Sequence, residues 1–222
     1  MSALDSGPLP EPSLEEEIRL AVPDETTLQR ILEAWSPQSV DRSYRDCYLD
    51  HPAFGLLKQR LAVRLRSLSG ARRIEIKGGG VQRAGVWQRP EWSQEWPEAW
   101  SRIPEELPPG PVRRCLLAHL PADQPLIELF TCEVTRRSAP ITLDDGGSVM
   151  LCIDQGEIRA GEKRVRIREV ELEWLSGSRD LWQAWMRALR ERYGLVPAAA
   201  SKFAVGLAML PLPEAWRHGF EY

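Results

Sequence analysis

Charged and apolar residues alternate in several short segments of this chain, and that alternation restricts the fold more than any other feature. Glu15, Glu17 and Arg19 share one side of an extended segment, with Ile18 and Leu20 on the other. Side chains two residues apart in a strand point the same way. The same pattern recurs at Arg64 and Arg66, Glu75 and Lys77, Arg89 and Glu91, and Glu169, Glu171 and Glu173. Each segment therefore predicts a strand with one charged and one apolar face.

Two arrangements account for such strands. The charged faces could be the solvated outside of an ordinary sheet, or they could line the interior of a sheet closed into a barrel. Helical periodicity at 25–35, 112–119, 179–193 and 199–210, with a short helical connection at 51–58, supplies helices that can cover apolar outer faces. We predict an α+β fold, an antiparallel eight-stranded closed β-barrel with packing helices, whose strands are 14–22, 39–49, 60–68, 72–77, 81–92, 126–137, 148–153 and 164–175.

The chain divides into a leader, one domain and a tail. Residues 1–13 are rich in proline and acidic residues and predict a flexible leader, 14–210 form the barrel domain, and 211–222 form a C-terminal tail. Residues 95–120 differ in composition and are interpreted as an excursion between strands. Trp87, Trp92, Trp96 and Trp100 are expected to pack helices against the sheet.

Composition excludes several classes of function. Lys plus Arg is 29 and Asp plus Glu is 32, which argues against a generic nucleic-acid binder. No apolar run is long enough to span a membrane, and we expect no membrane partner. The four cysteines form no C-x-x-C pair and no secretory signal precedes them, so we expect free thiols and a cytoplasmic protein. The sequence is compatible with a homodimer.

The signs of the charges predict what an enclosed interior would bind. Carboxylates gather in the first and last strands, where mutual repulsion at low dielectric would be relieved by a divalent cation with a preference for oxygen ligands. Basic residues dominate the strands between them and need anions, and phosphate suits the arginine fork. The pattern indicates a phosphorylated small molecule whose oxygens are bridged by a metal ion.

Short motifs in a fixed order resemble the CYTH superfamily, also called the triphosphate tunnel metalloenzymes. The matching segments are 15–19 for E-x-E-x-K, 47–52 for Y-[DE]-T-P, 63–66 for L-R-x-R, 74–77 for T-x-K, 89–91 for R-x-E, Arg136 in the sixth strand, 153–156 for L-D-x-G, 169–173 for E-x-E-x-E and 201–202 for S-K. The resemblance is closest to bacterial members that hydrolyse inorganic tripolyphosphate. It covers most of the domain and implies metal-dependent hydrolysis of a triphosphate, most of all tripolyphosphate, in a charged tunnel.

The resemblance also implies roles for individual residues. Metal ligands for Mg²⁺ or Mn²⁺ would be Glu15, Glu17, Glu91, Asp154, Glu169, Glu171 and Glu173. Triphosphate would be bound by Arg64, Arg66, Lys77, Arg89, Arg136 and Lys202, and the catalytic residues would be Arg19 and Lys77. An adenylate cyclase of the same fold and a non-catalytic binder of polyphosphate or nucleotide are the alternatives.

Three residues depart from the family pattern. Arg19 replaces a lysine, and arginine stays protonated, so it can bind phosphate but cannot act as a base. Val205 stands where an arginine often follows the S-K motif, and Glu75 adds a negative charge to the predicted tunnel. These changes put the substrate and turnover in question more than the fold, and Arg19 and Val205 favour the non-catalytic binder.

Overall fold

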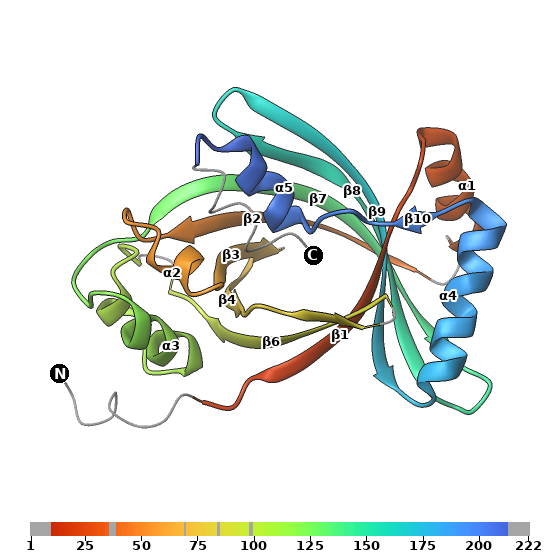
Figure 1. Cartoon of the computed structure of the whole chain (residues 1–222), viewed down its shortest axis with the longest axis horizontal. Helices are drawn as coiled ribbons and strands as arrows, with labels where there is room; N and C mark the ends of the chain where they lie inside the picture. The colour runs from red at the N-terminus through yellow and green to blue at the C-terminus, as the bar shows by residue number, and fades with distance from the viewer. Residues whose placement is uncertain (1–9, 36–38, 69, 84, 98–99, 213–222) are drawn as a thin grey trace.

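The charged strands close into a ring. The computed structural model describes residues 10–35, 39–68, 70–83, 85–97 and 100–212, and within these ranges eight antiparallel strands form a barrel (Figure 1). Their order is β1 (Ser13–Ala21), β9 (Lys163–Ser176), β8 (Ser148–Ala160), β7 (Ile127–Thr142), β2 (Val40–Asp50), β3 (Ala62–Leu68), β4 (Ala71–Lys77) and β6 (Val86–Glu95). Pairing of β1 with β6 closes the ring. The prediction of an eight-stranded closed barrel is confirmed.

Several strand boundaries differ from the prediction. The predicted strand 81–92 is a hairpin of β5 (Val81–Arg83) and β6, and Gly85 supplies a left-handed turn with φ of 83°. The strand predicted at 148–153 runs on to Ala160, where Gly161 turns the chain into β9. A two-residue strand, β10 (Val196–Pro197), extends the pairing of β1. The predicted leader and tail lie for the most part outside the described residues.

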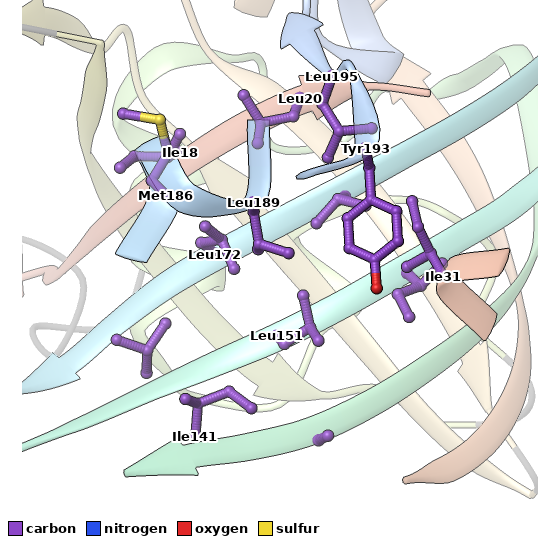
Figure 2. Packing of buried hydrophobic residues seen from close by; sticks show 14 of the residues in the cluster. Ile18, Leu20, Ile31, Ile141, Leu151, Leu172, Met186, Leu189, Tyr193 and Leu195 are labelled. Carbon is purple, nitrogen blue, oxygen red and sulfur yellow. The ribbon is translucent and has the colours of Figure 1, made fainter. Parts of the chain in front are cut away.

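Two helices cover the outer face of β1, β9, β8 and β7. They are α1 (Glu25–Trp35) and α4 (Arg179–Tyr193), and their apolar sides join those strands in one core cluster (Figure 2). That cluster joins Ile18 and Leu20 of β1 with Met186 and Leu189 of α4, and Figure 2 shows Met186 beside Ile18. The outward face of β1 is therefore its apolar face, which leaves the charged face inside the barrel.

The helix ends follow the sequence signals. Asp24 accepts the backbone N–H of Thr27 at 2.7 Å and caps α1. Ser178 accepts the N–H of Leu181 and caps α4, and Gly194 ends it with φ of 66°.

A second cluster covers the outer faces of β2, β3 and β4. It contains side chains of α2 (Gly55–Lys58) and α3 (Pro111–His119), and the 3₁₀ helix η3 (Pro104–Glu106) contacts α3. Trp92, Trp96 and Trp100 pack here, as predicted. Of the helix predicted at 51–58, only the last turn, α2, is formed. The Asp50 carboxylate fixes its start by accepting hydrogen bonds from the backbone N–H groups of Leu56 and Leu57 at 2.9 Å each.

The last helix lies against the inner side of the barrel. Helix α5 (Lys202–Met209) packs on β7 and β8 with Phe130 and Tyr48, whose side chains point inward. It begins later than the predicted residue 199 because the Ser201 hydroxyl caps it by accepting the N–H of Ala204. A Cβ at Gly206 would lie 2.1 Å from the Phe130 ring, so only glycine allows this approach. No helix in the described part of the chain is both long and apolar enough to cross a membrane.

Candidate functional site

The inward charged faces enclose a cavity of about 350 Å³. Most of the residues predicted from the sequence line it: Glu15, Glu17, Glu91, Glu171, Glu173, Arg19, Arg64, Arg66, Arg89, Arg136, Lys77 and Lys202. They come from six strands and α5, so only closure of the ring brings them together. The charged faces are an interior lining and not a solvated outer surface.

Asp154 and Glu169 lie behind this lining. Both are buried, Asp154 completely, and neither is among the residues that line the cavity. The Lys202 ammonium separates them from the open space: Nζ lies 2.8 Å from Asp154, 2.7 Å from Glu169 and 2.6 Å from Glu171. Burial works against this charge, but the three carboxylates outweigh it and hold the pKa of Lys202 well above its usual value.

The acidic side of the cavity combines β1, β6 and β9. Glu15 accepts hydrogen bonds from Lys77 at 2.6 Å and Arg89 at 2.7 Å, and Arg89 also pairs with Glu17. Burial opposes ionisation of Glu15, yet Lys77 and Arg89 lower its pKa. The pKa of Glu17 is raised instead, by burial and by the carboxylates of Glu15 and Glu171 although Arg89 acts against them. Glu17 is therefore harder to ionise than Glu15.

The basic side of the cavity contains two carboxylates of its own. Asp46 is buried and accepts two hydrogen bonds from Arg66, each 2.8 Å long, and a third from Arg64 at 3.3 Å. Glu75 accepts from Arg64 at 2.5 Å. Sequence reasoning did not single out Asp46. The sequence feature that could have identified Asp46 is its position two residues from both Tyr44 and Tyr48, which places all three on the inward face of β2.

Arg19 differs from the other cations of the lining in having buried nitrogens without a hydrogen-bond partner. Its side chain is 3% exposed, and its Nε lies 3.3 Å from Glu17. Its guanidinium lies over the Trp87 ring, 5.4 Å from the centroid. Nε and Nη2 are buried and have no hydrogen-bond partner. Buried donors without partners are costly, so an anion in the cavity would stabilise this arginine.

Two sequence expectations change with this geometry. Trp87 lines the cavity beneath Arg19 and does not pack a helix against the sheet, because it shares the inward face of β6 with Arg89. Val205 is half-buried in the apolar packing around α5 and is not among the cavity-lining residues. The missing arginine at that position therefore leaves no gap in the lining described above.

The donor chemistry of the acidic side fits a divalent cation. The carboxylates of Glu15 and Glu171 lie close enough to Glu17 for their charges to raise its pKa. Hard divalent cations prefer carboxylate oxygens as ligands. Across the described ranges, no three or more His, Cys, Asp or Glu residues stand as a ready-made metal cage. Lys77, Arg89, Arg136 and Lys202 hold these carboxylates instead, so binding would exchange ion pairs for metal contacts.

Comparison with known proteins identifies the same architecture. A candidate adenylyl cyclase from Hippeastrum with a dominant triphosphatase activity superposes with a TM-score of 0.62 at 18% identity, over 90% of this chain and 98% of that one. A candidate adenylate cyclase from Bacillus halodurans gives 0.60 at 18% identity, over 85% and 95%. The Mimivirus capping enzyme triphosphatase gives 0.52 at 12% identity, over 82% and 89%. At these identities the likeness shows the fold. The CYTH domain model matches residues 13–206, and the chain therefore belongs to the CYTH domain family.

Proposed function

We propose that this protein is a metal-dependent triphosphatase whose substrate is inorganic tripolyphosphate, as in the bacterial inorganic triphosphatases that its motifs resemble. The observation that carries the proposal is the buried guanidinium of Arg19, which lines a cavity with further cations and has two nitrogens without a hydrogen-bond partner. Membership of the CYTH family and the triphosphatase activity named for the Hippeastrum and Mimivirus proteins support it.

The lining divides into residues for the anion and residues for the metal. Arg64, Arg66, Lys77, Arg89, Arg136 and Lys202 would bind phosphoryl oxygens in place of some of their present carboxylate partners. Glu15, Glu17 and Glu171 would hold Mg²⁺ or Mn²⁺, with Glu91 and Glu173 as further oxygen donors. A bound divalent ion supplies charge neutralisation and orients the phosphate chain. Asp154 and Glu169 hold Lys202 in place.

The reaction follows from positioning and charge. Water attacks the terminal phosphorus while the bond to the bridging oxygen breaks, which yields orthophosphate and pyrophosphate, and the proton of the water passes to a phosphate oxygen. Arg19 stabilises the charge that develops on the terminal phosphoryl group and takes no proton, because a guanidinium stays protonated. Lys77, which contacts Glu15 at 2.6 Å and Glu91 at 3.5 Å, positions the water and the acidic side.

The cellular setting is part of the proposal. All four cysteines are free and buried, which supports a reducing compartment such as the cytoplasm. The partner is a small-molecule triphosphate, with no nucleic acid and no membrane. A homodimer stays a prediction that size-exclusion chromatography with light scattering can test.

The test is phosphate release from tripolyphosphate, thiamine triphosphate, ATP and GTP, each with Mg²⁺, Mn²⁺ or EDTA. We expect release from tripolyphosphate that needs a divalent cation and stops with EDTA. Absence of hydrolysis with every substrate and metal would refute the catalytic proposal. Tight binding of tripolyphosphate without release would support the non-catalytic binder, which Arg19 in place of lysine favours. Cyclic AMP formed from ATP would support the cyclase.

A further inference from the structure

The ring of Tyr44 lies between two arginines of the cavity lining. Tyr44 is on the inward face of β2, is 6% exposed and lines the cavity. The guanidinium carbon of Arg66, from β3, is 4.0 Å from the ring centroid, and that of Arg136, from β7, is 5.5 Å away. Strands β3 and β7 flank β2 in the barrel, so the ring separates two cations that come from opposite sides.

Each of these guanidiniums is also fixed at its edge by a carboxylate. Arg66 forms two hydrogen bonds with Asp46, and Arg136 forms two of 2.6 Å with Asp154. The Tyr44 hydroxyl donates to Asp154 at 3.4 Å, which ties the ring to the carboxylate that holds Arg136. Burial and the charge of Asp154 raise the pKa of Tyr44, so its hydroxyl stays a donor at neutral pH.

This arrangement limits where the two arginines can be. Two like charges at close range repel each other, and an aromatic face between them attracts both because its quadrupole is negative at the face. Without the ring, each guanidinium keeps its carboxylate but loses the surface that sets its distance from the other. The ring therefore controls the spacing of the two anion-binding groups.

We propose that Tyr44 is a positioning residue that spaces Arg66 and Arg136 so that a chain of three phosphates engages both at once, whereas a shorter chain gains less from the pair. The inference rests on the proposed function and adds to it a basis for selection by chain length. Tyr44 contacts no reacting atom in this scheme and acts only through the two arginines.

The test measures binding of tripolyphosphate and pyrophosphate by calorimetry in EDTA, so that no turnover interferes. For Tyr44→Leu we expect the Kd of tripolyphosphate to rise about tenfold and that of pyrophosphate less than about threefold, the scale of lost desolvated cation–π contacts. Tyr44→Phe keeps the ring and should stay within about twofold for both. If Tyr44→Leu does not fold, Tyr44→Met removes the aromatic face with a side chain that adapts to irregular space.

Tyr48→Leu is the matched control. Its ring lines the same cavity from the same strand but stacks on Phe130 at 4.6 Å and contacts Phe203 at 5.4 Å. It should lower the melting temperature and leave the ratio of the two Kd values unchanged. An unchanged ratio in the Tyr44 variants, or an equal shift in Tyr48→Leu, would overturn the inference. Failure of the unaltered protein to bind any phosphate chain would refute the proposed function itself and the inference with it.

Discussion

Replacement of Glu75 by glutamine should weaken the fold and strengthen anion binding at the same time. Glu75 lies directly opposite Arg64 in the pairing of β3 with β4, and its Oε2 accepts the Arg64 Nε–H at 2.5 Å. Burial opposes the ionisation of this carboxyl, but Arg64 and Arg66 outweigh it and lower the pKa from 4.5 to about 2. Glu75 is therefore both a structural partner of Arg64 and a competitor for it.

The pKa difference sets the size of the stability effect. Each pKa unit corresponds to about 1.4 kcal/mol, so ionised Glu75 favours the folded state by roughly 3 kcal/mol at pH 7. Glutamine keeps an acceptor for the arginine, and we expect Glu75→Gln to lower the free energy of unfolding by about 2 kcal/mol. Because the folded pKa is the lower one, this stabilisation is complete above about pH 4.5 and is lost between pH 4.5 and 2. The variant and the unaltered protein should therefore converge as the pH falls.

The same change should tighten anion binding. Two unit charges about 6 Å apart interact by roughly 3 kcal/mol at an effective dielectric of 20, and counterions and partial exposure reduce this. We expect the Kd of tripolyphosphate, measured by calorimetry in EDTA, to fall at least about tenfold in Glu75→Gln.

Urea unfolding followed by tryptophan fluorescence at pH 7, 4 and 3 gives the stability. Glu133→Gln is the control, because Glu133 is about half-exposed and pairs with Arg45 and Arg159 at 3.7 Å on the outside of the barrel. It should change stability by less than about 0.5 kcal/mol and leave affinity unchanged. Equal stability of the two variants at pH 7, or weaker tripolyphosphate binding by Glu75→Gln, would refute this reasoning.

Three further predictions concern other parts of the site and fold. Arg19→Ala should raise the Kd of tripolyphosphate at least about tenfold by removing a charged hydrogen-bond donor, and the Kd of Arg19→Lys should lie between those of Arg19→Ala and the unaltered protein. An unchanged affinity by calorimetry would contradict the role of Arg19. Glu171→Gln should weaken Mn²⁺ binding, measured by electron paramagnetic resonance, by at least about tenfold, and equal affinity would exclude Glu171 as a ligand. Gly206→Leu should lower the free energy of unfolding by roughly 1–3 kcal/mol because its side chain would clash with Phe130. Urea unfolding measures this change, and full stability of the variant would show that α5 packs elsewhere.

The sequence predicted the barrel because alternation determines which side chains share a face. Ile18 and Leu20 pack outside and Glu17 and Arg19 point inside, as period-two reasoning requires. Closure of the ring joins these separate faces into one cavity. The ordered motifs predicted this closure, because they resemble a family whose strands form a tunnel. The split of 81–92 into a hairpin escaped prediction because the segment keeps an extended pattern on both sides of the turn at Gly85.

Contacts between strands could not be predicted from single segments. Which carboxylate holds which arginine depends on register, so neither the Asp46 pairing with Arg66 nor the cage around Lys202 is visible along the chain. Tyr44 resembles an ordinary core aromatic in sequence, and only its two flanking guanidiniums distinguish it. Residue types therefore predicted the lining, and three-dimensional pairing determines which charges remain available.

A crystal structure with Mn²⁺ and tripolyphosphate bound would test the central proposal most directly. Anomalous scattering would locate the manganese independently of the protein phases. We predict a manganese peak inside the barrel within bonding distance of Glu15, Glu17 or Glu171, and a phosphate chain with one end on Arg19 and others on Arg64, Arg66 or Arg136. Density for the anion only on the outer surface, with the ion pairs of the cavity unchanged, would contradict it.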